Sequence, residues 1–323
     1  MKLKVFAAAA LAAVMLVSCS SADSSSQAGG QQNDTSTSAE RERKDLEGNV
    51  MEKYKDQIVE IPPDGYDGKD RSLTYGEFKK YTYYSNTAER ETPVNVMLPV
   101  DYSEDRKYPV LYILHGFWDT QDWMARPVVS LPKILGNLQA KGEAEEMIVV
   151  LPYIFCSKEL KTCTGMDAEN SLAYDNFIND LETDLIPFIN KTFSVAEGRE
   201  NTAITGFSMG GRESLFIGLK HPEQFGYIGA VCPAPGLIEI PGSPMHSGQL
   251  LESEMVFPED QKPYILMISS SKADNVVSTS PDSYRQAFTK NGVEFLSHEL
   301  KLTAHDHTSV KPHLYNFLRT LFH

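Results

Sequence analysis

The chain alternates between short apolar runs and longer amphipathic stretches. The apolar runs, which are typical of buried strands, cover residues 108–114, 147–151, 201–205, 264–269 and 295–300. The amphipathic stretches 174–190 and 310–322 have apolar residues at helical spacing. Because strand-like and helix-like segments follow one another, the pattern predicts an α/β fold with a mainly parallel central sheet and helices on both faces.

The first residues have a different pattern. Lys2 and Lys4 precede an apolar run from Val5 to Val17, which is too short to span a bilayer but is typical of a signal-peptide core. The run leads into Leu-Val-Ser before Cys19, which resembles a bacterial lipobox. We therefore expect residues 1–18 to be a lipoprotein signal peptide and Cys19 to become the lipidated first residue. The alternative is ordinary secretion with cleavage nearby. Both interpretations export the protein, and lipidation anchors it to the bacterial cell envelope with its globular part outside the cytoplasm.

Residues 19–45 are rich in Ser, Gly, Gln, Asp and Thr and contain almost no large apolar side chains. Such a segment cannot bury enough apolar surface to fold, so we expect a flexible tether. The length of the remaining stretch, 46–323, fits a single α/β domain, and no internal repeat divides it.

The chain is acidic, with a formal net charge of −14 that becomes −16 when residues 1–18 are removed with their two lysines. An acidic chain disfavours a nucleic-acid partner. The sequence has no Walker loop, dinucleotide fingerprint or Cys-x-x-Cys pair, so no cofactor is implied. His305 and His307 flank Asp306 but lack a second ligand pair at zinc spacing, so no metal site is predicted.

The segment 206–211, GFSMGG, matches the nucleophile elbow G-x-S-x-G. A strand-like run precedes it and a helix-like segment, 212–220, follows it, which is the order that an elbow requires. Ser208 is therefore the candidate nucleophile of a serine hydrolase. The alternative is a glycine-rich turn with an incidental serine.

A serine nucleophile needs a general base and an orienting acid, which in this type of site follow the serine in the order Asp, then His. The histidines far enough beyond Ser208 are His246, His298, His305, His307 and His313. His305 and His307 are best placed, because they lie in the predicted loop between a strand and a helix. Asp274 follows the strand-like run 264–269 and is the candidate acid, with an ordinary turn aspartate as the alternative. Asp282 is the second choice, since it is expected to cap a helix over 283–290.

The oxyanion of an acyl-transfer intermediate needs two preoriented donors. The amide of Met209, directly after Ser208, is the first candidate. The amide of Phe117 is the second, because the buried run 108–114 leads into His115-Gly116-Phe117-Trp118. We expect His115 itself to be a structural histidine.

These residues resemble the feruloyl and acetyl-xylan esterases of the first carbohydrate esterase family, in the esterase D-like branch of the α/β-hydrolases. The resembling segments are 83–85, 94–99, 107–116, 206–211, 305–306, 311–312 and 314–317 (LYNF). In that family an aspartate and a helix with a pattern like LYNF often follow the catalytic histidine, which selects His305 over His307. The resemblance implies an α/β-hydrolase fold and an acyl-enzyme that hydrolyses feruloyl or acetyl esters on plant cell-wall polysaccharide such as xylan.

Departures from the family pattern affect the substrate pocket. Trp118 and Asp119 stand where the family often has glycines, and Thr303-Ala304 stands where it often has Gly-Gly. Trp118 would either stack on an aromatic acyl group or shorten the pocket to the size of acetate. The alternative for Trp118 and Trp123 is packing of the loop against the core.

The remaining cysteines lie in a segment that we expect to be exported. Cys156 and Cys163 flank a short loop, so a local disulfide is predicted as possible in oxidising surroundings. Cys232 ends an apolar run and is expected to be a buried free thiol.

Three other functions share some of these features. A general short-chain carboxylesterase or thioesterase, and an acyltransferase of the mycolyl-transferase type, would use the same catalytic residues. A non-enzymatic carbohydrate-binding lipoprotein would not need serine, acid and base in this order.

Overall fold

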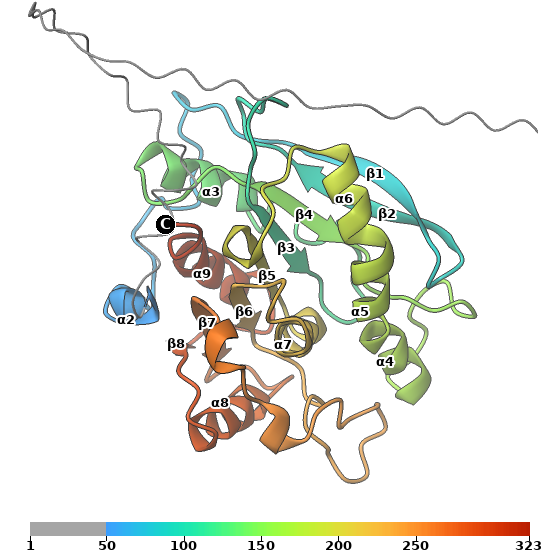
Figure 1. The fold of residues 1–323 in the computed structure, drawn as a ribbon. Helices are drawn as coiled ribbons and strands as arrows, with labels where there is room; N and C mark the ends of the chain where they lie inside the picture. The colour runs from blue at the N-terminus through green and yellow to red at the C-terminus, as the bar shows by residue number, and fades with distance from the viewer. Residues whose placement is uncertain (1–49) are drawn as a thin grey trace, which may run out of the picture.

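A central sheet of eight strands organises the computed structural model, which describes residues 50–323 (Figure 1). The predicted signal peptide, Cys19 and the predicted tether lie outside the described residues. The strands are β1 (Phe78–Ser85), β2 (Arg90–Met97), β3 (Val110–Leu114), β4 (Ile148–Pro152), β5 (Thr202–Gly206), β6 (Tyr227–Val231), β7 (Ile265–Ser271) and β8 (Leu296–Leu300). Their order in the sheet is β1-β2-β4-β3-β5-β6-β7-β8.

The sheet is parallel from β4 through β8, and β2 pairs antiparallel with both β1 and β4. Every residue of β3, β4, β5 and β6 is buried, as expected for strands covered on both faces. The predicted mainly parallel sheet and single α/β-hydrolase domain are therefore confirmed. Because parallel strands end at the same edge, the loops that follow β3, β5, β7 and β8 converge there.

Helices cover both faces of the sheet (Figure 1). The α-helices are α2 (Val50–Lys55), α3 (Leu131–Ala140), α4 (Ala168–Asp175), α5 (Phe177–Asp180), α6 (Ile186–Thr192), α7 (Met209–Lys220), α8 (Ser280–Lys290) and α9 (His307–Leu318). A π-helical turn, η1 (Leu181–Leu185), joins α5 to α6, and short 3₁₀ turns lie at η2 (Arg199–Asn201), η3 (Glu252–Glu254) and η4 (Glu259–Gln261). Between residues 50 and 323, no helix has the length and apolar character that a membrane crossing requires.

The start of α8 differs from the prediction. The helix begins at Ser280 after Thr279, with Pro281 in its first turn, so Asp282 is not its cap. Asp282 instead lies inside the first turn and forms an ion pair with Arg285 at 2.7 Å. An acidic residue in the first turn still has a favourable interaction with the helix dipole.

A buried chain of hydrogen bonds ties the last helix to the sheet. Nε2 of His298 faces the carbonyl oxygen of Glu60 at 3.3 Å, and because a carbonyl only accepts, this nitrogen carries the proton. Nδ1 of His298 then accepts from Ser269, whose oxygen accepts from Nδ1 of His313. Nε2 of His313 in turn accepts from Thr205 at 2.9 Å. Burial lowers the pKa of both histidines, so both are neutral and each has one fixed tautomer.

The two ends of the domain also meet. The Asn316 side chain in α9 accepts from the amide of Val59 at 3.0 Å and donates to the carbonyl of the same residue at 2.8 Å. This pair of bonds fastens the segment after α2 to the C-terminal helix α9.

Candidate active site

Ser208 lies on a tight turn between β5 and α7, with φ 56° and ψ −115°. This conformation is costly for a residue with a side chain, so the surroundings must hold it in place. A Cβ atom at Gly206 would lie 2.3 Å from the carbonyl oxygen of Gly210, and one at Gly210 would lie 2.4 Å from that of Leu114. The two glycines of the motif are therefore required by close approach of the backbone.

The structure brings Ser208, His305 and Asp274 together in a hydrogen-bonded triad. Nδ1 of His305 lies 2.6 Å from Oδ2 of Asp274, and Nε2 lies 2.9 Å from Oγ of Ser208. Because a carboxylate only accepts, Nδ1 carries the proton and Nε2 is free to accept from the serine hydroxyl. This is the tautomer that a general base needs.

Asp274 is held by groups that favour its ionised form. Oδ1 accepts from the amides of Val276 and Val277 at 2.9 and 3.3 Å, and the side chain is 1% exposed. Burial alone would raise its pKa, but the hydrogen bond and charge of His305, together with the two amides, outweigh burial and lower it. Asp274 therefore stays a carboxylate.

The two predicted oxyanion donors are both unengaged. Within residues 50–323, neither the amide of Met209 nor that of Phe117 has a hydrogen-bond acceptor. Met209 is the first residue of α7, where the orphan amides of a helix start and its dipole favour negative charge. The loop that carries Phe117 packs against the elbow, since a Cβ at Gly116 would lie 3.5 Å from Cβ of Ser208.

His115 is a structural residue. It is 1% exposed, Nδ1 lies 2.8 Å from the carbonyl oxygen of Gly116, and Nε2 accepts from the amide of Ile154 at 3.1 Å. Burial lowers its pKa to about 4, so the ring is neutral. Its two bonds fix the loop after β3 against the end of β4.

The two tryptophans have different surroundings. Trp123 stacks on Phe207 with ring centroids 5.2 Å apart, and Phe207 in turn contacts His305 at 4.5 Å. This aromatic stack behind the histidine is not apparent from the sequence. Trp118 is 53% exposed, with φ 69°, and its amide donates to the hydroxyl of Tyr174. Packing therefore accounts for Trp123, whereas the Trp118 ring is open to a ligand.

Cys232 adds a thiol to the same cluster, a contact that sequence reasoning missed. The ligand atoms of Cys232, Asp274 and His305 lie within 4.8 Å of one another. Metal binding requires a thiolate and a free imidazole nitrogen. Burial and the charge of Asp274 raise the pKa of Cys232 to about 12, and both nitrogens of His305 are engaged. The donor set fits a hydrogen-bonded triad rather than a metal ion.

The predicted disulfide is not formed, because Cys156 and Cys163 are free thiols. Cys156 is buried next to Ser85, and burial raises its pKa to about 12. Sγ of Cys163 lies 3.6 Å from the carbonyl oxygen of Gly165. The two thiols thus have different partners.

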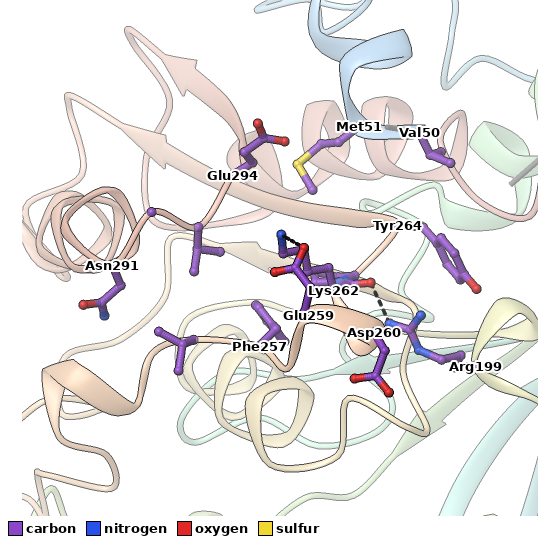
Figure 2. A pocket seen from close by; sticks show the side chains of 14 residues that line it. Val50, Met51, Arg199, Phe257, Glu259, Asp260, Lys262, Tyr264, Asn291 and Glu294 are labelled. Carbon is purple, nitrogen blue, oxygen red and sulfur yellow. Dashed lines mark hydrogen bonds and ion pairs between the residues drawn. The ribbon is translucent and has the colours of Figure 1, made fainter. Parts of the chain in front are cut away.

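A cavity of about 710 Å³ has no triad residue in its lining. It is lined by residues that precede strands, such as Arg199 before β5, Tyr264 before β7 and Glu294 before β8 (Figure 2). The triad residues follow these same strands and so lie at the opposite edge of the sheet. Arg199 is also committed to the fold, since it donates to the carbonyls of Gln261 and Lys262 and lies over the Tyr264 ring. The cavity is therefore not the site that contains Ser208.

Comparison with known proteins identifies the family of the chain. A model of the Esterase family matches residues 85–263, which is more than half of the chain. The chain belongs to this esterase family. Over 82% of its length the esterase also superimposes on a CE1 ferulic acid esterase from Anaeromyces mucronatus, solved in complex with ferulic acid, with a TM-score of 0.78 and 38% identity. The match covers 98% of that chain and confirms the resemblance to the first carbohydrate esterase family.

Curated relatives are longer than the segment they share with the esterase. An endo-1,4-beta-xylanase/feruloyl esterase from Xylanibacter ruminicola is 31% identical over 179 residues, which are 53% of this chain and 24% of the relative. An acetyl esterase from Caldicellulosiruptor saccharolyticus is 28% identical over 172 residues, which are 50% of this chain and 58% of the relative. The chain thus spans about a quarter of the first relative and somewhat more than half of the second.

Proposed function

We propose that this esterase removes feruloyl groups from plant cell-wall polysaccharide such as xylan, with Ser208 as nucleophile, His305 as general base and Asp274 as orienting acid. The observation that carries the proposal is the hydrogen-bonded triad on a positive-φ elbow. The names of the relatives support the substrate class, since they include ferulic acid and acetyl esterases and a xylanase/feruloyl esterase.

The proposed reaction has two acyl-transfer steps. Nε2 of His305 takes the hydroxyl proton of Ser208 while Oγ attacks the ester carbonyl, and Asp274 stabilises the imidazolium that forms. The carbonyl oxygen becomes an oxyanion, to which the amides of Met209 and Phe117 donate. Collapse of the intermediate breaks the bond to the alcohol, which receives the proton from His305. Water activated by the same histidine then releases the acid and restores Ser208.

The exposed indole of Trp118 supports an aromatic acyl group. It is 53% exposed and lies on the same loop as Phe117, whose amide is the proposed oxyanion donor. An offset or edge-to-face aromatic pair contributes about 0.5–1.5 kcal/mol beyond area burial. Acetate offers no ring for this contact, so we favour ferulate over acetate as the acyl group.

We also propose that the enzyme is exported and anchored through a lipid on Cys19. The support is the pattern of the first 19 residues: two lysines, an apolar run, and a small residue before the cysteine. Metabolic labelling with a palmitate analogue tests this. Label should enter the wild-type chain and be lost in Cys19→Ala, and equal labelling of both chains would refute the anchor.

The decisive experiment compares methyl ferulate with 4-nitrophenyl acetate, with Ser208→Ala as the blank. A higher kcat/KM for ferulate that disappears in the variant is the expected result. Turnover of acetate alone would indicate an acetyl-xylan or general short-chain esterase. Product formation only with an added oligosaccharide acceptor would indicate an acyltransferase. Activity that persists in Ser208→Ala would refute the nucleophile.

A further inference from the structure

Asp119 lies beside the nucleophile on the loop that carries Phe117. Its amide donates to the carbonyl of Gly116 at 3.3 Å, which closes a tight turn. A Cβ atom built on Gly116 would lie 3.3 Å from Oδ2 of Asp119 and 3.5 Å from Cβ of Ser208. The carboxyl group and the nucleophile therefore both lie close to Gly116, with little room for a side chain between them.

The Asp119 carboxyl group is half-buried and has no donor. Within residues 50–323, no group donates a hydrogen bond to either of its oxygens. Burial raises its pKa to about 6, against the charges of Arg126 and His305, which lower it. At neutral pH it is a carboxylate, and its two oxygens can accept hydrogen bonds from a ligand. A ligand with hydroxyl groups would supply the donors.

The position of Asp119 relative to His305 indicates which part of the bound ester Asp119 would contact. In the proposed reaction Nε2 of His305 returns its proton to the departing alcohol, so the alcohol must lie next to this nitrogen. Asp119 is close enough to His305 for the two charges to interact, and it is also close to Ser208. It therefore borders the alcohol side of the reacting ester.

We propose that the Asp119 carboxylate accepts hydrogen bonds from hydroxyl groups of the sugar that carries the ester, and so selects sugar esters over esters of simple alcohols. This inference rests on the proposed esterase function. Hydrogen bonds to a charged group contribute about 1.5–3 kcal/mol, which corresponds to a selectivity of at least about tenfold. Asp119 would thus be a specificity residue for the alcohol, whereas Trp118 acts on the acyl group.

The test uses two esters with the same acyl group, feruloyl arabinose and methyl ferulate, and measures kcat/KM for each at pH 7.5. Asp119→Asn should lower the ratio of sugar ester to methyl ester about tenfold, mainly through a higher KM for the sugar ester. The kcat for methyl ferulate should stay within about twofold. Asp122→Asn is the matched control, because Asp122 lies on the same loop but bonds to Lys80 and Asn95. It should leave the ratio unchanged.

The pH dependence of the ratio of kcat/KM for the sugar ester to kcat/KM for the methyl ester gives a second readout. Protonation of the triad lowers kcat/KM for both esters alike, so it cancels in this ratio. The wild-type ratio should fall as the pH drops through about 6, where the carboxylate takes up a proton, and the Asp119→Asn ratio should stay flat. An unchanged ratio in Asp119→Asn, or an equal loss of kcat/KM on both esters, would overturn this inference and leave the proposed esterase function intact. A wild-type enzyme that hydrolyses neither ester would overturn the proposed function and the inference with it.

Discussion

Replacement of Asp274 by Asn tests its proposed role as the orienting acid, because the change removes a charge while keeping the shape of the side chain. Oδ1 of Asp274 accepts from two backbone amides, and Oδ2 accepts from Nδ1 of His305. An asparagine has only one oxygen, and the two amides are fixed in the backbone. Its oxygen must therefore face the amides, and its NH₂ group must face the imidazole.

The consequence is a change of tautomer in His305. Two donors cannot face each other, so Nδ1 loses its proton and Nε2 gains it, and Nε2 can then no longer accept from Ser208. Loss of the correct tautomer in a Ser-His-Asp triad costs about 10⁴ in kcat in the serine protease for which it is documented. We expect a fall of about 10³–10⁴-fold here, or about 4–5.5 kcal/mol of activation free energy, with KM nearly unchanged.

The assay is steady-state hydrolysis of methyl ferulate by Asp274→Asn, with the melting temperature measured alongside. Asp282→Asn is the control, because Asp282 follows the same strand but is 61% exposed and pairs with Arg285. It should retain wild-type activity. A loss of less than tenfold in folded Asp274→Asn would refute the orienting role of Asp274.

Three further predictions follow from the surroundings of the elbow. Gly210→Ala places a methyl group 2.4 Å from the carbonyl oxygen of Leu114, so activity and melting temperature should both fall, and an unchanged melting temperature would contradict the close approach. Because burial lowers the pKa of His115 from 6.5 to about 4, the unfolded chain binds a proton that the folded chain does not, and the contribution of His115 to stability should fall by about 3 kcal/mol as the pH drops from about 6.5 to 4. Urea unfolding of the wild type and of His115→Asn measures this contribution as the difference between their two pH dependences. Trp118→Ala should lower kcat/KM for methyl ferulate about fivefold and leave 4-nitrophenyl acetate within twofold, whereas equal losses would argue against stacking.

The parts of the site that depend on local sequence were predictable. An elbow needs small residues at fixed spacing around the serine, so the segment 206–211 identifies it without knowledge of the rest of the fold. Asp274 and His305 could be located because each follows a recognisable strand, and parallel strands bring their ends together. The proline at position 281 could also have indicated the earlier start of α8, since proline favours the first turn of a helix.

Contacts between loops were not predictable. Asp119, Cys232 and His305 lie far apart in the sequence, and they meet only because the loops after β3, β6 and β8 converge at one edge. The disulfide prediction failed for a related reason. The spacing of Cys156 and Cys163 permits a bridge, but the direction of each side chain depends on its neighbours in space.

The bonds between Val59 and Asn316 have a consequence for the order of folding. They join residues 257 positions apart, so nearly the whole domain must be synthesised before this contact can form. His305, the proposed base, also comes from the C-terminal part of the domain, two residues before α9 begins. Long-range contacts of this kind form slowly, because the entropy of closing a large loop must be offset before they stabilise the chain. A chain emerging from its N-terminus therefore stays incompletely folded, and without a complete triad, until its C-terminal helix is available.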